Sequence, residues 1–248
     1  MLTKLHFVPT PKAKKNLIKE GIDGKDIVVT GNTVIDALTQ VLDYPFNMQH
    51  SPLSKIKFNG KRAIMVTCHR RETWGGELEE ICLAIKDIVA IFPDVIVIYP
   101  VHLNPNVRQK VYEILYNLDR IHLLEPLDYL TFVNLMSLSY LILTDSGGVQ
   151  EEAPTLKKPL LVMRKVTERQ EAIEVGASKL VGSNRENIVR ELSNLLNDKN
   201  AYNSMTDKPN PFGDGKAAIR IMEALKCWFY GNTVLLPEDE EFGFYSVI

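Results

Sequence analysis

The strongest constraint on the fold is an alternation of short apolar runs and amphipathic helical stripes from residue 61 to about residue 198. The runs are Leu-rich or β-branched and lack strict alternation, which is typical of strands buried on both faces. They are Ala63–Thr67, Val95–Tyr99, Ile121–Leu124, Tyr140–Thr144 and Leu160–Met163. Between them, apolar residues recur at three- and four-residue steps over 78–92, 107–118 and 188–196. This order predicts an α/β fold with a doubly wound parallel sheet.

The composition is that of an ordinary globular protein. Of 248 residues, 45% are hydrophobic and 24% charged, and the net charge of −2 gives no basic excess that would indicate a nucleic-acid partner. The longest apolar runs are far shorter than the roughly 20 residues of a membrane span, and the N-terminus lacks the apolar core of a signal peptide. The three cysteines form no CxxC pair. We therefore expect a reduced, cytoplasmic protein that binds neither nucleic acid nor membrane.

The first 58 residues follow a different pattern. Leu5–Val8 and Ile27–Thr30 are predicted strands, and Thr10 with Pro11 opens a helix to about Glu20. Two strands and one helix are too few for an independent core, so we expect the end of another domain and its linker. The expected divisions are 1–58 for this piece, 59–208 for a Rossmann-like domain, 209–230 for a C-terminal helix and 231–248 for an unassigned tail.

Basic residues follow the first predicted strand of the long alternation. Ligands of parallel sheets bind beyond the carboxyl ends of the strands, so these loops carry the candidate sites. His69, Arg70 and Arg71 lie in the first loop, and guanidinium groups match phosphate oxygens in bidentate geometry. The loop therefore indicates an anionic ligand, although a solvated turn paired with Glu72 is the favoured interpretation of the tripeptide alone.

Single side chains mark the next two loops. His102 follows the second strand, where a lone histidine more often hydrogen-bonds to backbone than binds a ligand. After the third strand, a turn leads into a helix that bears Phe132. This ring either packs in the core or flanks a flat base, with the amides of the turn facing the edge of the base.

The fourth loop carries the clearest signal. Ser146, Gly147 and Gly148 connect a strand to a helix, and glycines allow the backbone to approach a phosphate closely. The helix N-terminus adds free N–H donors, and Glu152 lies one turn further on, where a carboxylate can accept both hydroxyls of a ribose. This pattern favours a phosphate site, while a plain strand–helix turn is the alternative.

The loop after the fifth strand contains Arg169. Its guanidinium could reach a sugar or phosphate, or it could form a surface salt bridge with Glu168 or Glu171. The histidines and cysteines show no metal-ligand spacing, and there is no dinucleotide or Walker fingerprint. We therefore expect neither a metal nor a cofactor.

Taken together, these loops resemble one family, the non-hydrolysing bacterial UDP-N-acetylglucosamine 2-epimerases, over residues 5 to 226. Cys68 departs from the family's usual Gly or Ala, Gln170 from its usual Pro, and residues 231–248 match nothing in the family pattern. The matching stretches are HFVPT (6–10), VTGNTVIDAL (29–38), HRRE (69–72), YPVHLNPNVR (99–108), LTDSGGVQEEAP (143–154), TERQEA (167–172) and NPFGDGKA (210–217).

The resemblance implies a glycosyltransferase-B type fold of two Rossmann-like domains, with residues 59–208 as the C-terminal, UDP-binding one. It also implies a homodimer and a role in supplying precursors of cell-surface polysaccharide. It assigns His69 and Arg169 to the phosphate–sugar junction, with His69 catalytic, and Arg70 and His102 to an allosteric second UDP-N-acetylglucosamine. The implied contacts with UDP are Leu127 backbone and Phe132 at uracil, Ser146, Gly147 and Gly148 at the diphosphate, and Glu152 at the ribose.

The implied reaction converts UDP-N-acetylglucosamine to UDP-N-acetylmannosamine by elimination and re-addition of UDP. In the family, the carboxylates thought to move the sugar proton lie on the N-terminal domain, most of which we expect this chain to lack. Two other functions stay open at this point. One is a UDP-sugar glycosyltransferase of the same fold, and the other is a non-catalytic UDP-binding remnant.

Overall fold

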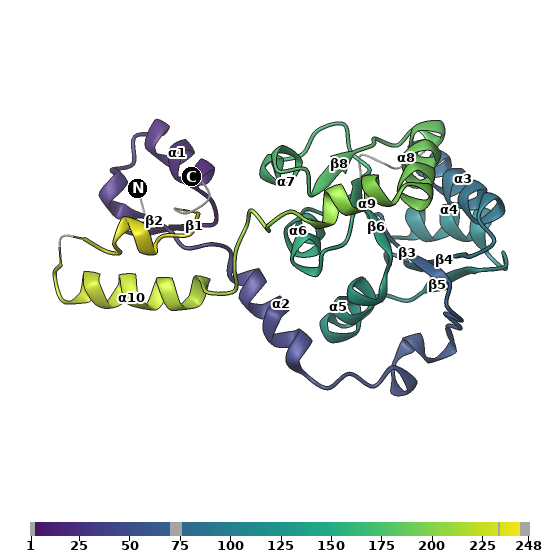
Figure 1. The fold of residues 1–248 in the computed structure, drawn as a ribbon, viewed down its shortest axis with the longest axis horizontal. Coiled ribbons are helices and arrows are strands. Elements are labelled where there is room, and N and C mark those ends of the chain that lie inside the picture. Colours follow the sequence, from purple (N-terminus) through teal and green to yellow (C-terminus); the bar gives the residue numbers. More distant parts are fainter. Residues whose placement is uncertain (1–2, 70–75, 233, 244–248) are drawn as a thin grey trace. The chain divides into compact units, whose positions relative to one another are not determined.

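The computed structural model describes residues 3–69, 76–232 and 234–243, which fall into two compact units (Figure 1). The larger unit is Tyr44–Pro209, and the smaller unit combines Met1–Asp43 with Asn210–Ile248. Each unit is described by itself below. The larger unit carries the candidate site.

A six-stranded parallel sheet forms the centre of the larger unit, in the order β5-β4-β3-β6-β7-β8. Its strands are β3 (Arg62–Thr67), β4 (Val95–Pro100), β5 (Ile121–Leu124), β6 (Leu141–Thr144), β7 (Leu160–Val162) and β8 (Ser178–Leu180). After β3, the next two strands along the chain, β4 and β5, are added on one side of the sheet. After β6, β7 and β8 are added on the other side. The order therefore reverses between these two neighbours, and ligands of open parallel sheets bind at such a switch point.

Helices cover both faces of this sheet, as Figure 1 shows. One face packs against α3 (Gly76–Ile91), α4 (Pro105–Leu115) and α8 (Arg185–Asn197), and the main apolar core lies between them. On the other face, α5 (Tyr129–Leu138) contacts β3. The remaining elements of this unit are α6 (Gly147–Glu152), α7 (Gln170–Glu174), α9 (Lys199–Thr206) and the 3-10 helices η2 (Met48–His50), η3 (Pro52–Lys55) and η5 (Ala153–Leu156).

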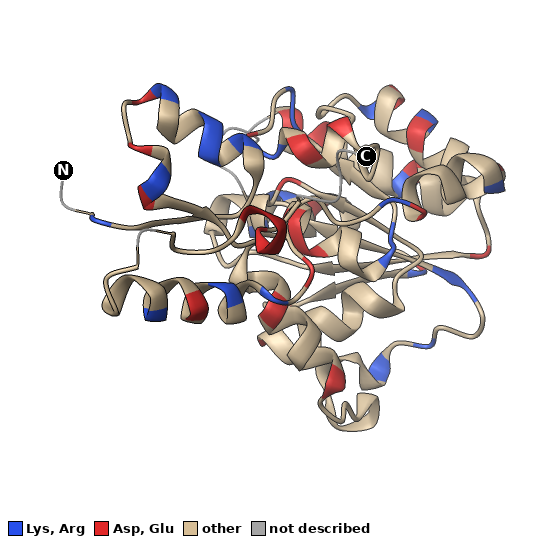
Figure 2. Cartoon of the chain, turned by 60° about the vertical axis from the view of Figure 1, so that its left-hand side comes forward, with Lys and Arg blue, Asp and Glu red and all other residues tan. Residues whose placement is uncertain are grey.

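The strands are almost free of charged residues, which lie on the helices and loops (Figure 2). Arg62 and Lys179 are the two exceptions within the strands of the larger sheet. This distribution is what a sheet buried on both faces requires, because an unpaired charge in such a layer is costly.

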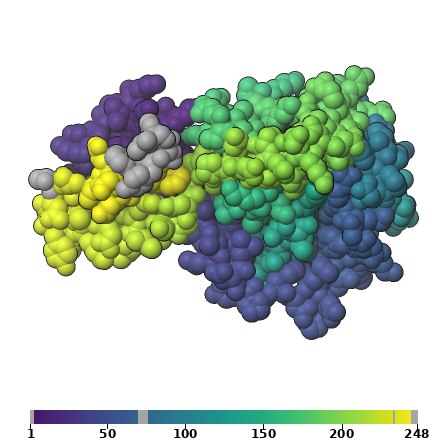
Figure 3. All heavy atoms as spheres, viewed as in Figure 1, coloured from purple at the N-terminus to yellow at the C-terminus, as the bar shows by residue number. Residues whose placement is uncertain are grey.

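The smaller unit is assembled from the two ends of the chain, which lie together in Figure 3. The parallel strands β1 (His6–Val8) and β2 (Ile27–Val29) pair in register. Near the other end of the chain, the Phe242 N–H donates to the Val29 carbonyl at 2.9 Å. The other elements are α1 (Pro11–Lys19), η1 (Gly24–Asp26), α2 (Thr33–Asp43), α10 (Ala217–Phe229) and η6 (Glu238–Glu240).

The predicted fold class and the five predicted strands of the larger sheet are confirmed. The sixth strand, β8, was missed because Ser-Lys-Leu is too short and too polar to stand out. Within residues 1–58, expected to hold the end of another domain and its linker, Leu53 and Ile56 are buried in the larger unit. In the tail left unassigned, Leu235 and Leu236 are buried in a small apolar cluster of the smaller unit. An apolar pair without a helical or strand period gave no signal in the sequence.

Candidate functional site

A pocket of about 300 Å³ lies at the carboxyl ends of the central strands, at the switch point between β3 and β6. Its ten lining residues come from the segments that follow β3, β4, β5 and β6, including α5. They are Thr67, Cys68, His69, Pro100, His102, Pro126, Leu127, Phe132, Ser146 and Val149. Sequence positions far apart in the chain therefore meet at one place, as the topology of the sheet requires.

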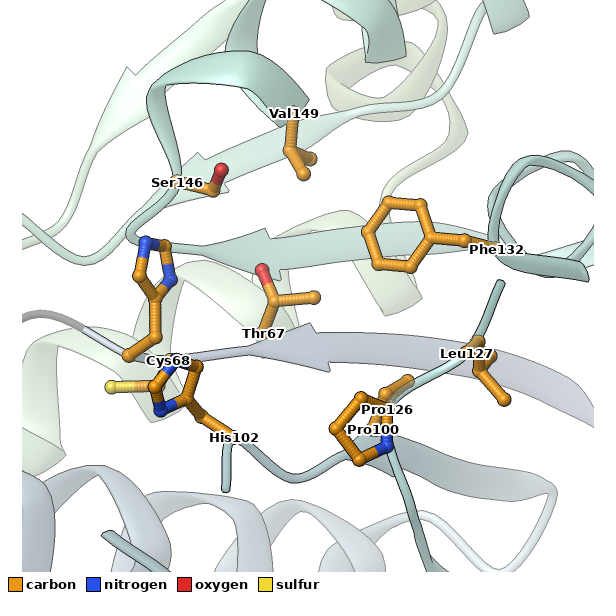
Figure 4. A pocket seen from close by; sticks show the side chains of 10 residues that line it. Thr67, Cys68, Pro100, His102, Pro126, Leu127, Phe132, Ser146 and Val149 are labelled. Atoms are coloured by element: carbon orange, nitrogen blue, oxygen red, sulfur yellow. The ribbon is translucent and has the colours of Figure 1, made fainter. Parts of the chain in front are cut away.

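The two ends of the pocket differ in chemistry (Figure 4). Ser146 and His102 lie at one end, Phe132 and Leu127 lie at the other, and Thr67 lies between them. A ligand that fits this arrangement has a polar or charged part and a flat or apolar part. The pocket is mostly apolar with a few placed polar groups, which is the usual character of a small-molecule site.

His69 is held by a carboxylate across the switch point. Its Nδ1 lies 3.0 Å from Oδ1 of Asp145, and its backbone N–H donates to Oδ2 of the same residue at 2.9 Å. Asp145 is completely buried, directly after β6. A carboxylate at Nδ1 fixes the orientation of an imidazole ring, so Nε2 is the ring nitrogen that remains on the side away from Asp145.

His102 lines the pocket beside His69, with the two ring centroids 5.8 Å apart. Its Nδ1 accepts a hydrogen bond from the backbone N–H of Asn104 at 3.1 Å. The backbone contact considered from the sequence is therefore present, and the ring also reaches the site. These two interpretations of a lone histidine are compatible here.

The apolar end of the pocket depends on the start of α5. Asp128 caps this helix by accepting from the backbone N–H of Thr131 at 2.9 Å and from its hydroxyl at 2.7 Å. The cap fixes the turn that carries Leu127 and the first residues of the helix. Phe132 is half-buried and lines the pocket, so its ring is not simply a core side chain.

The Ser-Gly-Gly turn lies directly after β6 and begins α6. The Ser146 N–H donates to Oγ1 of Thr144 at 3.0 Å, and Gln150 Nε2 donates to the Ser146 carbonyl at 3.0 Å. A Cβ atom on Gly147 would lie 3.2 Å from Cζ of Arg169. A larger residue at this position would therefore push the guanidinium away from the turn.

Arg169 reaches this turn from the loop that precedes α7. Its Nε donates to Oε1 of Glu151 at 2.9 Å, while Nη1 lies 3.8 Å from Glu168. Its backbone N–H donates to Oγ1 of Thr167, and that hydroxyl donates to the buried Gln150 at 2.6 Å. The salt bridge with Glu168 considered from the sequence is thus secondary, and the main carboxylate partner is Glu151.

Glu152 is buried on α6, with 7% of its surface exposed, and Tyr129 donates a hydrogen bond to its Oε2 at 3.1 Å. Burial raises the pKa of Glu152 to about 7, while the bond from Tyr129 lowers this pKa and the charge of Glu151 raises it further. The position of a Cβ atom on Gly148 would be 3.8 Å from Glu152 Oε1 and 4.0 Å from Ser146 Oγ. The carboxylate therefore adjoins the polar end of the pocket.

The structure brings most of the candidate residues together. His69, His102, Leu127, Phe132 and Ser146 line the pocket itself. Gly147, Gly148, Glu152 and Arg169 do not line it but lie around its Ser-Gly-Gly turn. Arg70 lies outside the described residues.

Asp145 and Tyr129, the partners of His69 and Glu152, were missed in the sequence. Asp145 was given no role, although a carboxylate directly after a central strand is a usable signal. Tyr129 follows the helix cap, but nothing in the sequence shows that its hydroxyl meets Glu152. In the described ranges, no group of three or more His, Cys, Asp or Glu residues could hold a metal ion. The described helices are also too short or too polar for any of them to span a membrane.

Comparison with known proteins gives a consistent result. The family model for UDP-N-acetylglucosamine 2-epimerase matches residues 1–226. A UDP-N-acetylglucosamine 2-epimerase from Yersinia pestis is 50% identical over 230 residues, which cover 91% of this chain and 61% of that protein. This chain spans about 62% of the length of the first curated relatives it matches, two proteins from Ralstonia.

Solved structures agree with the sequence comparison. The S. aureus MnaA–UDP co-structure matches with a TM-score of 0.86 and 42% identity, covering 92% of this chain and 62% of that one. The UDP-GlcNAc 2-epimerase from Neisseria meningitidis bound to UDP-GlcNAc matches with a TM-score of 0.83 and 41% identity, covering 91% and 62%.

Proposed function

Because this chain belongs to the UDP-N-acetylglucosamine 2-epimerase family, we propose that its larger unit binds UDP and UDP-N-acetylglucosamine for 2-epimerisation of the sugar. The observation that carries the proposal is the pocket at the β3–β6 switch point, with its polar and apolar ends. The similar S. aureus structure contains UDP, and the similar N. meningitidis structure contains UDP-GlcNAc.

Each part of UDP has a matching part of the site. Phe132 and the Leu127 backbone suit the uracil ring, which is flat and has polar edges. Glu152 suits the ribose hydroxyls. The Ser146–Gly148 turn and the Arg169 guanidinium suit the diphosphate, because both offer N–H donors at one place.

The reaction we propose eliminates UDP from UDP-N-acetylglucosamine and adds it back after protonation of C2 on the opposite face, which gives UDP-N-acetylmannosamine. Negative charge develops on the β-phosphate as the sugar C–O bond breaks. His69, held by Asp145, and Arg169 are the groups placed to stabilise it. One well-placed donor of this kind is worth about 3 kcal/mol of transition-state stabilisation.

The proton at C2 needs a separate base and acid within hydrogen-bond reach. Among the described residues that line the pocket there is no Asp or Glu, and Asp145 is already engaged with His69. We therefore propose that this chain supplies the nucleotide and leaving-group side of the site. By itself it binds UDP well and epimerises slowly, so a purely UDP-binding role is the second candidate.

Four finer assignments belong to the same proposal. The product serves as a precursor of cell-surface polysaccharide, the protein works in the cytoplasm, and its functional form is a homodimer. Arg70 and His102 bind a second UDP-N-acetylglucosamine as an activator, which the position of His102 beside His69 supports.

Calorimetric titration with UDP tests the nucleotide site. We expect binding with a stoichiometry of one and a matching increase in the melting temperature, since saturation at 100 times Kd stabilises a protein by about 2.7 kcal/mol. Phe132→Ala should lower the affinity for UDP. Phe58→Ala, on a residue outside the pocket, should leave this affinity unchanged. No binding at millimolar UDP by the folded protein would refute the proposal.

Deuterium exchange tests the reaction. In D₂O, NMR of UDP-N-acetylglucosamine should show little incorporation at C2 with this chain alone, because the roughly 10²- to 10⁴-fold contribution of each proton-transfer group is missing. Exchange at the rate of an ordinary enzyme would show that a base is present within residues 1–248 and would overturn this part of the proposal.

A further inference from the structure

Two neighbouring carboxylates on α6 have different partners. Glu151 is bound by the Arg169 guanidinium at 2.9 Å, whereas Glu152 receives the phenol hydroxyl of Tyr129 at 3.1 Å. In the described part of the chain, no lysine or arginine forms an ion pair with Glu152. A guanidinium neutralises the charge of a carboxylate, while a phenol contributes one neutral donor. The ionised Glu152 therefore keeps most of its acceptor capacity.

Tyr129 is positioned firmly enough to orient this carboxylate. It is the first residue of α5, directly after the Asp128 cap, whose two hydrogen bonds to Thr131 fix the helix start. About 39% of Tyr129 is exposed, and its hydroxyl points to Glu152. Oε2 of Glu152 is the atom held, and Oε1 lies next to Gly148.

We propose that Tyr129 is a positioning and specificity-determining residue, whose hydroxyl orients Glu152 so that this carboxylate recognises the ribose of a uridine diphosphate. The inference rests on the proposed UDP site and deepens it. Its consequence is selectivity for ribonucleotides over 2′-deoxyribonucleotides. A carboxylate accepts hydrogen bonds from both vicinal hydroxyls only when its plane is fixed, and a site built to bond a hydroxyl rejects the analogue that lacks it.

The charged groups around Glu152 add a pH dependence. Tyr129 faces it from α5 and Glu151 from α6, and the charge of Glu151 is offset by Arg169 from the loop before α7. The ionised Glu152 accepts with both oxygens, whereas the protonated form keeps one carbonyl acceptor and donates through its O–H. Since the pKa of Glu152 is raised to about 7, UDP affinity should increase as the pH rises through neutrality. Loss of the Tyr129 donor, which lowers this pKa, should move that increase to higher pH.

The test compares UDP with 2′-deoxy-UDP by calorimetry over the neutral pH range, for the wild type, Tyr129→Phe and Glu152→Gln. Tyr116→Phe is the matched control, because Tyr116 is exposed and far from α6 in the sheet order. In the wild type, UDP should bind about tenfold more tightly than its deoxy analogue. Tyr129→Phe should reduce UDP affinity about five- to tenfold and 2′-deoxy-UDP affinity much less, and should shift the pH profile upward.

Glu152→Gln should remove both the ribose selectivity and the pH dependence, and the double variant should show little further loss beyond Glu152→Gln. If Tyr129→Phe lowers the affinities for UDP and 2′-deoxy-UDP equally, or if the losses of affinity add up in the double variant, the role of Tyr129 is merely structural and the inference is overturned. Failure of the wild type to bind either nucleotide would instead refute the proposed UDP site. Unchanged affinity in Tyr129→Phe with normal wild-type binding refutes the role of Tyr129 alone.

Discussion

The two units differ in how much of their packing a local sequence pattern can specify. In the larger unit, the strands and helices carry apolar patterns of their own, and the core lies between the sheet and α3, α4 and α8. In the smaller unit, the start of α10 is held by Asp36, which lies 181 positions earlier than Ala217. Local periodicity is therefore enough to specify the first unit, whereas the second depends on pairs that no local pattern reveals.

α10 buries smaller side chains than the strands of the larger sheet. β3, β4 and β6 contribute fully buried Leu, Ile and Val residues to the larger core. On α10, by contrast, the buried residues are Ala217 and Ala224. The stability of the larger unit should thus be sensitive to the size of its core residues, and the attachment of α10 more sensitive to polar contacts.

The largest effect we expect is from Leu143→Ala in β6. Leu143 is fully buried in the main core, so the cavity should lower the free energy of unfolding by about 3.5 kcal/mol. Chemical denaturation measures the loss. Leu138→Ala, on an exposed leucine of α5, is the control and should change this free energy by less than about 0.5 kcal/mol. If both variants lose a similar free energy of unfolding, burial of Leu143 in the core does not determine the stability of the larger unit.

Asp36→Ala should have the next largest effect, and it should be confined to the smaller unit. Asp36 is buried and accepts the backbone N–H groups of Ala217 at 3.1 Å and Ala218 at 2.8 Å, so it acts as a cap for α10. Its loss should cost about 2.5 kcal/mol, because α10 loses its cap and the buried Ala217 donor becomes unsatisfied.

Hydrogen exchange followed by mass spectrometry distinguishes the units in this variant. Amides of α10 should exchange faster in Asp36→Ala, while those of β3 keep their protection. Asp43→Ala, on an exposed residue at the end of α2, is the control. Faster exchange throughout the chain would mean that the two units unfold as one.

The same difference explains what could be predicted from the sequence. The Val95–Pro100 strand and the Ser146–Gly148 turn are visible as local patterns, and the order of the strands brings their ends together. The pairs His69–Asp145 and Tyr129–Glu152 could not be predicted, since each depends on register and helix orientation rather than on spacing. The contact between Asp36 and α10 could not be predicted either, because it also depends on how two distant helices are oriented.

A smaller effect is expected from Glu152→Gln, and it should depend on pH. The pKa of Glu152 is raised to about 7 in the folded protein, mainly by burial, so ionisation of this group destabilises the fold. The destabilisation is absent below the unfolded pKa, develops as the pH rises toward about 7 and is complete above it. Without nucleotide, Glu152→Gln should therefore be about 2 kcal/mol more stable than the wild type in mildly alkaline buffer and equal to it in acid.

Denaturation curves across this pH range measure the difference. Glu174→Gln, on α7, serves as a control whose stability should stay parallel to that of the wild type. A Glu152→Gln variant that is less stable than the wild type at alkaline pH would contradict the raised pKa. A variant that is more stable at alkaline pH but binds UDP more weakly would show that the carboxylate is retained for recognition at a cost in stability.

The smallest change in stability should come from the exposed face of α10. This helix buries Ala217 and Ala224 and exposes large apolar side chains, among them Trp228 and Phe229, the latter 78% exposed. A side chain that is already in water contributes little to the core, so Phe229→Ser should alter the free energy of unfolding by less than about 0.5 kcal/mol. Ala224→Ser on the buried face of the same helix is the comparison and should cost more, because its hydroxyl enters an apolar cluster. If Phe229→Ser proves the more destabilising of the two in chemical denaturation, Phe229 contributes to packing that its exposure does not indicate, and the contrast between the two units must be revised.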